Sequence, residues 1–150
     1  MFSQDEGGGG GRGGKDDDSG KKSAAQPGKW IEKNEAMSTE AAGYQDQIAG
    51  NHPGFVYEVN GVTFDGYDEH RGVLVDAKSS YAPFIKDGKF VPWFTGEKAL
   101  VEQARSQTKA ANGTPVEWHV SDEGSMRLIK DILEDNGLGS IKVIYTPRKK

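Results

Sequence analysis

The dipeptide Asn60-Gly61 sets the local topology in the middle of this chain, because it is a strong signal for a two-residue β-hairpin turn. A strand is predicted on each side of it, over Phe55–Val59 and Val62–Asp65. After a polar loop, a further apolar run predicts a third strand over Val73–Lys78. Three sequential strands of this kind form an antiparallel meander.

Three charged side chains fall on this meander in an arrangement that suits a metal-dependent hydrolase. Asp65 ends the second predicted strand, whereas Asp76 and Lys78 lie two residues apart on the third and therefore share one face. If the two strands pair as antiparallel neighbours, Asp65 lies beside Asp76. Two carboxylates can hold Mg²⁺ or a similar hard cation, and a lysine can support the nucleophile or the developing charge. The alternative is a polar edge strand without a catalytic role, because Asp and Lys are common on solvated strand faces.

The first 28 residues lack the apolar side chains that a folded core requires. They hold nine of the 21 glycines and a run of three aspartates. We therefore expect a flexible linker or tail over residues 1–28 and a single domain over residues 29–150. A glycine-rich start of this kind is more typical of the middle of a longer polypeptide than of a natural N-terminus.

Charge and composition exclude several classes of protein. The net charge of −4 argues against a protein that coats DNA non-specifically, because such proteins are usually basic. It argues less against a nuclease, whose metal-binding acids count as negative until the metal arrives. The absence of cysteine excludes a disulfide framework and a cysteine metal site. No apolar run approaches the roughly 20 residues of a membrane span, and the start of the chain lacks the apolar region of a signal peptide.

Helices are predicted on both sides of the meander. Lys29–Ile48 has a rough 3.6-residue apolar period, and Ser38-Thr39-Glu40 within it is a typical helix start. A second helix is predicted over Thr95–Ala111, with Thr95 as its cap. A third is expected to be capped by Ser121 and to end at Asn136-Gly137.

Two later strands alternate with these helices, over Val116–Val120 and Ile141–Thr146. Crossover connections make them parallel to each other. The order helix, three strands, helix, strand, helix, strand predicts an α/β fold with a mixed sheet flanked by helices. Tyr81–Phe94 combines aromatic and turn residues, so it is expected to form a hairpin-like excursion or a loop. Its aromatic rings would then cap the core or stack on nucleic acid.

This order of elements, with its acids, resembles the restriction-endonuclease-like fold and its PD-(D/E)xK motif. In that fold the first aspartate lies on the second core strand, as Asp65 does here, and the (D/E)xK triplet lies on the third. Phe64 replaces the proline of the motif's name, and Asp76 is the shorter acid of the D/E choice. A closer resemblance, over about residues 36–145, is to the restriction endonuclease fold toxin 5 family, and it is carried by Tyr44-Gln45, Gly61–Gly66 (GVTFDG), Asp76-Ala77-Lys78 and Trp118-His119.

The resemblance implies a metal-dependent nuclease toxin at the C-terminus of a longer secreted protein. Such a domain uses Mg²⁺ or Mn²⁺ to hydrolyse phosphodiester bonds of nucleic acid, with DNA favoured, in the cytoplasm of a competitor cell. A type VI or related contact-dependent system delivers it, a cognate immunity protein is its partner, and no membrane association is implied. Two alternatives stay open: a catalytically silent nuclease-fold domain that binds a partner, and an RNase.

The resemblance also implies roles for particular residues. Asp65, Asp76 and the Ala77 carbonyl would hold the metal. Glu40 matches the acid that many members of the superfamily use as an extra ligand, although it also reads as an ordinary surface glutamate. Lys78 would position or deprotonate the attacking water and stabilise the charge that develops on the phosphate.

Two further residues are candidates with equally ordinary alternatives. Gln103 is expected to point toward the site or to pack at the edge of the core. His119 is expected to contact a phosphate or shuttle a proton, or else to be structural. Trp118 is expected in the core. Solvated surface is predicted for most of the polar loop residues, namely His52, Asp68, Glu69 and His70.

Overall fold

The computed structural model describes residues 26–33, 37–50 and 52–149 of the chain. The predicted linker over residues 1–28 lies almost wholly outside these ranges, so the boundary of the domain stays a prediction. The elements in chain order are β1 (Lys29–Glu32), α1 (Thr39–Ala49), β2 (Phe55–Val59), β3 (Val62–Phe64), β4 (Gly66–Asp68), β5 (Val73–Ser79), a short 3-10 helix (Ala82–Phe84), β6 (Ile85–Lys86), β7 (Lys89–Phe90), α2 (Gly96–Ala111), β8 (Val116–Val120), α3 (Glu123–Asp135) and β9 (Ile141–Tyr145).

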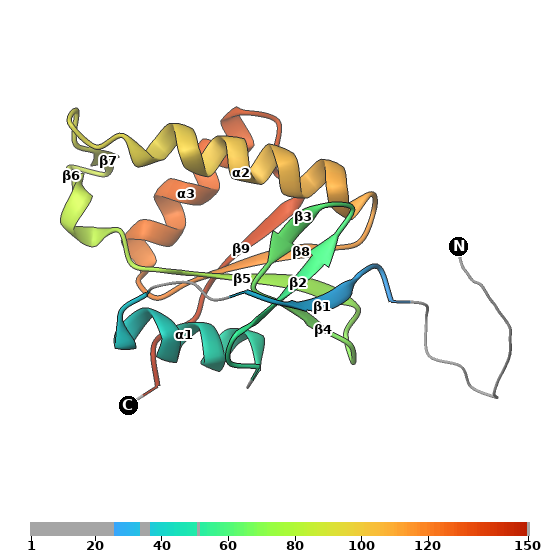
Figure 1. Cartoon of the computed structure of the whole chain (residues 1–150). Helices are drawn as coiled ribbons and strands as arrows, with labels where there is room; N and C mark the ends of the chain where they lie inside the picture. Colours follow the sequence, from blue (N-terminus) through green and yellow to red (C-terminus); the bar gives the residue numbers. More distant parts are fainter. Residues whose placement is uncertain (1–25, 34–36, 51, 150) are drawn as a thin grey trace, which may run out of the picture.

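The strands form a mixed sheet with an antiparallel sheet beside it (Figure 1). The mixed sheet has the order β4-β5-β8-β9, in which β4 is antiparallel to β5 and the strands β5, β8 and β9 run parallel. The second sheet has the order β1-β2-β3. Helices flank the mixed sheet, so the predicted α/β class is confirmed, as is the parallel pairing of β8 and β9.

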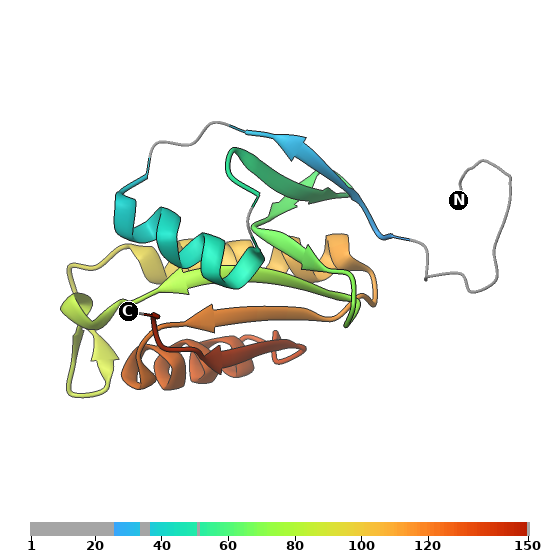
Figure 2. The ribbon, with the colours of Figure 1, turned by 90° about the horizontal axis from the view of Figure 1, so that it is seen from below.

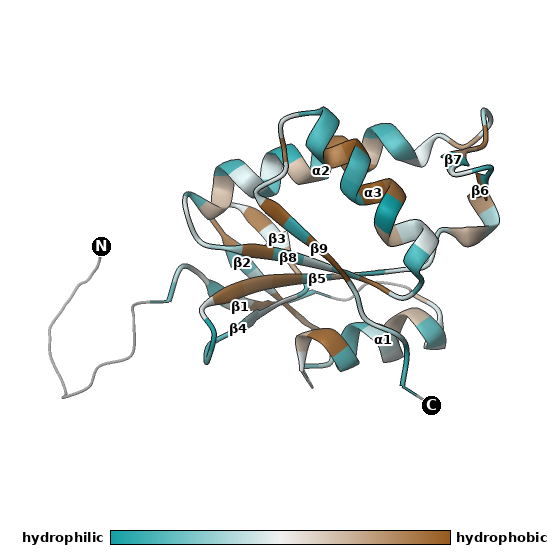
Figure 3. Ribbon diagram, turned by 180° about the vertical axis from the view of Figure 1, so that it is seen from behind, coloured by the Kyte–Doolittle hydropathy of each residue, from teal (hydrophilic) through white to brown (hydrophobic). Residues whose placement is uncertain are grey.

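Helices cover both faces of the mixed sheet. α1 packs against β5 and β4 on one face, and α2 and α3 lie on the other (Figures 1 and 2). Apolar residues follow much of β5 and one side of α3 (Figure 3), and Leu100 and Ala104 are buried on α2. The main core lies between the sheet and these two helices, where Leu74, Trp118 and Ile129 are fully buried. Because helices lie on both faces of the sheet, the first four residues of β5 are buried whichever face they point to.

The hairpin predicted from Asn60-Gly61 is present between β2 and β3. Both residues have positive φ angles, 50° for Asn60 and 83° for Gly61, as the tight turn requires. The adjoining strands pair with Val59 opposite Val62. Local turn chemistry therefore specifies this part of the fold.

The prediction of a helix over Lys29–Ile48 is wrong in its first part. Residues 29–32 form β1, with Trp30 opposite Tyr57 and Ile31 opposite Val56 of β2. Apolar residues in so short a segment fit a strand as well as a helix, and a partner strand more than twenty residues away decides between them. α1 begins only at Thr39.

The predicted meander also differs from the structure, because the second strand divides at Asp65. β3 stays with β2, whereas β4 leaves to pair with β5 in the mixed sheet. At the division Gly66 lies against α1, where an added Cβ would come within 2.8 Å of the Ala49 Cβ. The close approach of the helix therefore requires glycine at this position.

The helix starts follow the predictions in part. The Ser38 hydroxyl caps α1 by accepting a hydrogen bond from the Ala41 N–H at 3.1 Å. The cap of α3 is Asp122 and not Ser121, because the Asp122 carboxylate accepts from the Ser125 N–H at 2.9 Å. Thr95 precedes α2 without a side-chain capping bond. The predicted excursion over residues 81–94 contains the β6–β7 hairpin.

Candidate functional site

Asp65, which lies between β3 and β4, contacts Asp76 of β5. The Asp65 N–H donates to Asp76 Oδ1 at 2.9 Å, and the Ala77 N–H donates to Asp65 Oδ2 at 2.7 Å. The antiparallel register explains this reciprocal contact, because Gly66 lies opposite Val75 and so brings the preceding residue beside Asp76. The expected proximity of the two carboxylates is present in the structure.

Lys78 lies on the same face of β5 as Asp76, and both side chains are buried. The side chain of Lys78 is 9% exposed and that of Asp76 is 5% exposed, with 3.0 Å between Lys78 Nζ and Asp76 Oδ2. The ammonium also donates to Gln103 Oε1 and lies 4.4 Å from the centre of the Trp118 ring. A buried ion pair of this kind is held in one arrangement by its hydrogen-bonding neighbours.

Two glutamines of α2 complete the surroundings of the Asp76 carboxylate. Gln103 Nε2 and Gln107 Nε2 lie 3.3 Å and 3.2 Å from Asp76 Oδ2. They are four residues apart and therefore face the sheet together. Gln107 is fully buried, and its Oε1 accepts from Trp118 Nε1 at 2.8 Å. The structure thus places Gln103 at the site.

Gln107 is a site residue that the sequence analysis missed. Its spacing from Gln103 on the buried face of α2 was the available signal, because two amides at i and i+4 on an apolar stripe need polar partners. The sequence alone does not show that α2 lies over β5, and so it does not identify Asp76 as the partner of these two amides.

The oxygen donors at the site fit a small hard cation. Asp76 Oδ1 accepts one hydrogen bond from the described residues, whereas a carboxylate oxygen has two lone pairs. In the described ranges no three or more His, Asp or Glu side chains gather as a metal-binding group. Two carboxylates are a usual protein contribution to a Mg²⁺ site, because Mg²⁺ retains several waters, whereas zinc takes three or four protein ligands.

The segment that builds this site matches a known family. The restriction endonuclease fold toxin 5 family matches residues 41–123, which is more than half of the chain. The chain belongs to this family. The match is narrower than the resemblance expected over residues 36–145, and of the expected site residues only Glu40 lies outside it. A search of curated proteins finds no match.

Membership in the restriction endonuclease fold toxin 5 family makes the chain a toxin domain whose fold is that of nucleases acting on nucleic acid. The mixed sheet between helices agrees with this fold. None of the helices in the described part of the toxin domain has the length and apolar character that a membrane span requires.

Glu40 lies on the first turn of α1 and is exposed in the toxin domain. The beginning of α1 is at the same end of the molecule as the end of β5 (Figures 1 and 2). Its role as an additional metal ligand stays a prediction.

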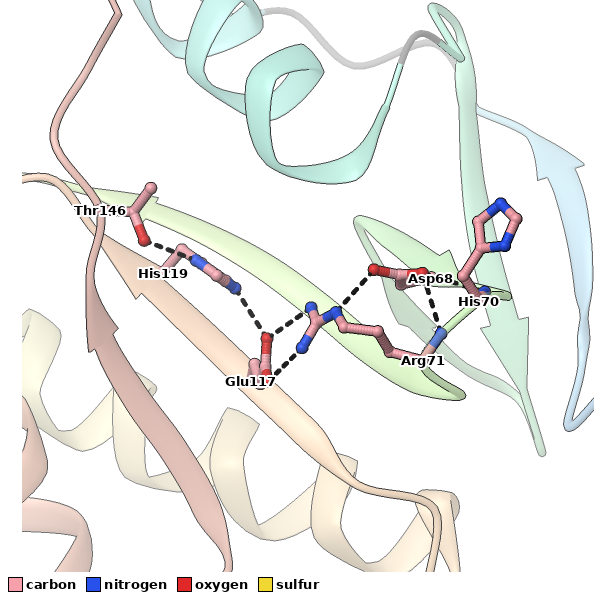
Figure 4. A network of polar contacts seen from close by, with 6 residues as sticks. All are labelled: Asp68, His70, Arg71, Glu117, His119 and Thr146. Carbon is pink, nitrogen blue, oxygen red and sulfur yellow. Dashed lines mark hydrogen bonds and ion pairs between the residues drawn. The ribbon is translucent and has the colours of Figure 1, made fainter.

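His119 of the toxin domain lies on the other face of the mixed sheet from Asp76 and Lys78, within a polar network (Figure 4). Its Nδ1 is 2.7 Å from Thr146 Oγ1, and its Nε2 is 3.0 Å from Glu117 Oε1. These contacts favour the structural interpretation of His119, and its catalytic role stays a prediction.

Arg71 connects this network to the turn between β4 and β5. Its guanidinium donates to both oxygens of Glu117, at 2.8 and 2.9 Å, and to Asp68 Oδ2 at 2.8 Å. Asp68 also accepts from the backbone N–H groups of His70 and Arg71, so its carboxylate is bound within the turn. The His70 side chain points away from the network in Figure 4. The network joins β8 to the β4–β5 turn.

The network predicts a loss of stability in acid. Hydrogen bonds from Arg71 lower the pKa of Glu117, with partial burial opposing. A carboxylate with a depressed folded-state pKa stabilises the fold above its unfolded pKa of about 4.3, and this contribution is lost as pH falls through the folded-state pKa. Replacing Arg71 with glutamine should lower stability near pH 7 by about 1 kcal/mol, since the arginine is half exposed, and should flatten the decline between about pH 5 and 3.

Thermal unfolding between pH 3 and pH 7 checks this prediction. The matched control is Arg127→Gln, which removes only the exposed i,i+4 ion pair with Glu123. Wild-type and Arg71→Gln curves that stay parallel down to pH 3 would contradict the assigned cause.

Proposed function

We propose that the chain is a divalent-metal-dependent endonuclease that hydrolyses phosphodiester bonds of DNA. The observation that carries this proposal is the reciprocal contact between Asp65 and Asp76, with Lys78 paired to the second carboxylate. Carboxylates that hold a hard cation beside a buried ammonium suit phosphodiester hydrolysis, because the reaction gathers negative charge on the phosphate. An intact set of all three residues weighs against a silent binding module.

Asp65 and Asp76 would hold Mg²⁺ or Mn²⁺, helped by the Ala77 carbonyl, with Glu40 as an additional ligand. When bound, the cation polarises the scissile phosphate and lowers the pKa of a water molecule. The backbone contacts between the two aspartates fix their carboxylates relative to each other. This positioning limits the rearrangement that the site needs when substrate binds.

Lys78 would orient the attacking water and stabilise the developing charge. Its ammonium is oriented by Asp76 Oδ2 and Gln103 Oε1 and packed against Trp118. Gln103 thus positions both the lysine and the carboxylate. Burial strengthens the electrostatic effect of the ammonium, because little water screens it.

The biological role that we propose follows from the toxin family. The domain would act as a secreted effector in the cytoplasm of a competitor cell, after delivery by a contact-dependent system. A cognate immunity protein would protect the producing cell. Membership in the restriction endonuclease fold toxin 5 family supports the toxin role.

Cleavage of supercoiled plasmid by the full chain tests the function. With Mg²⁺ we expect nicked and linear products, and with EDTA we expect the rate to fall by on the order of 10²- to 10⁴-fold, since the cation contributes several kcal/mol. A structured RNA is assayed in parallel to test the RNase alternative. Cleavage that is unchanged in EDTA would contradict the metal dependence, and no cleavage of DNA or RNA by folded protein would contradict the nuclease.

A further inference from the structure

An aromatic cluster joins the end of β5 to the surface of the molecule. Tyr81 contacts Phe94 at 6.1 Å between ring centres, Phe94 stacks on Phe84 at 4.6 Å, and Phe84 contacts Trp93 at 5.8 Å. Trp93 is the outermost member and is 68% exposed, more than the other large apolar side chains that lie exposed in the described residues. Tyr81 packs against the core and the inner rings pack against each other, whereas the Trp93 ring is mostly open to solvent.

Two lysines lie on the β6–β7 hairpin of the same segment. Lys86 and Lys89 are directly opposite in the antiparallel pair, so their side chains share one face. Both residues are exposed. Like charges placed opposite each other are unfavourable unless an anion compensates them. Asp87 at the tip is the only acid between residues 80 and 95, in a chain whose net charge is −4. The hairpin is therefore a locally cationic surface.

This surface borders the candidate active site. Tyr81 follows Lys78 by three residues, and burial raises the pKa of Tyr81, with the charge of Lys78 opposing and that of Asp76 adding to the shift. The Tyr81 phenol therefore interacts electrostatically with both charged groups of the site. In two perpendicular views the hairpin extends from the end of the sheet at which β5 terminates (Figures 1 and 2).

We propose that Trp93, Lys86 and Lys89 bind a single-stranded stretch of the nucleic acid next to the bond that is cut. A base of this stretch stacks on Trp93, and its phosphates lie against the two lysines. This inference rests on the proposed nuclease function and adds the form of the substrate. A single strand fits better than a duplex, because an open aromatic face can stack only on a base that is itself unstacked.

Binding by the full chain in EDTA tests this inference without cleavage, and Lys78→Ala protein is a second background. The probes are a fluorescein-labelled 20-nucleotide DNA strand, the same sequence as a duplex, and the corresponding RNA strand. Trp93→Ala should weaken binding of the single strands by roughly 10- to 100-fold and leave duplex binding within about threefold. Phe55→Ala, which removes another exposed aromatic ring on β2, is the matched control and should change neither.

The lysines are tested by the salt dependence of the same binding. Replacing Lys86 and Lys89 together with alanine should reduce the slope of log affinity against log salt by about 1.4, which is about 0.7 for each lost phosphate contact. An unchanged slope would show that Lys86 and Lys89 do not contact phosphates of the bound strand. Equal weakening of single strand and duplex by Trp93→Ala would contradict the preference for unstacked bases.

The two proposals fail in different ways. If wild-type protein cleaves plasmid but the Trp93→Ala protein binds every probe as wild type does, the proposed binding surface is wrong and the proposed nuclease function stands. The exposed ring would then be assigned to a protein contact. If wild-type protein cleaves neither DNA nor RNA, and Trp93→Ala still weakens the binding of single strands, the proposed nuclease function is wrong and the proposed binding surface stands.

Discussion

Replacing Lys78 with alanine is expected to reduce metal-dependent cleavage by at least on the order of 10²- to 10³-fold, which is the cost of removing one charge-stabilising group from a preorganised site. The ammonium is 3.0 Å from Asp76 Oδ2 and has a buried side chain, so water cannot replace it with an equivalent charge. The measurement is the initial rate of plasmid nicking with Mg²⁺. Lys142→Ala is the matched control, because Lys142 is exposed on β9.

The Lys78→Ala protein is expected to stay folded. Removing one partner of a buried ion pair costs up to about 3–5 kcal/mol where the other is left without partners. Here Asp76 keeps the Asp65 N–H and the amides of Gln103 and Gln107 as donors, so we expect a smaller loss of about 1–2 kcal/mol. A melting temperature near that of wild type with cleavage retained within about threefold would show that Lys78 has no role in the reaction.

Replacing Trp118 with alanine is expected to have the largest effect on stability. The indole is fully buried in the core between the mixed sheet and the helices α2 and α3, and it lies under the Lys78 ammonium. Loss of a buried tryptophan costs about 3–5 kcal/mol, because it removes buried apolar area and leaves a cavity. Urea unfolding measures this as a lower midpoint with a similar slope.

Trp118→Phe separates packing from hydrogen bonding at this position. Phenylalanine fills much of the space but cannot donate to Gln107 Oε1, so about 1–3 kcal/mol should be lost for the unsatisfied amide. Trp93→Ala is the exposed control, with an expected change within about 0.5 kcal/mol. A Trp118→Ala midpoint indistinguishable from that of wild type would contradict the central place of this ring in the core.

Several features follow from residues close together in the sequence. Asn60-Gly61 predicts the β2–β3 turn, because few other dipeptides accept two positive φ angles. The alternation of Val116, Trp118 and Val120 with polar residues predicts which face of β8 packs into the apolar core, although Glu117 on the other face is also buried. The apolar stripe of α2 likewise predicts its inward face.

Long-range pairing decided what these local signals left open. β1 is a strand because β2 is available as a partner, and β3 ends at Phe64 because the chain after Asp65 pairs with β5 instead. The cap of α3 moved from Ser121 to Asp122, where the carboxylate reaches the Ser125 N–H. For the strands the local sequence permits two conformations of similar free energy, and a distant contact selects one. The Asp122 cap, in contrast, is selected by a contact only three residues away.

The candidate site shows the same division. By itself the sequence determined which charged groups the candidate site contains, because Asp65, Asp76 and Lys78 and their spacing are a local property of two strands and one loop. The tertiary structure alone decided that α2 covers this face, so that Gln107 binds Asp76, and that His119 lies on the opposite face. The physical reason is that the strand period assigns residues to two faces but does not say which helix packs on either one.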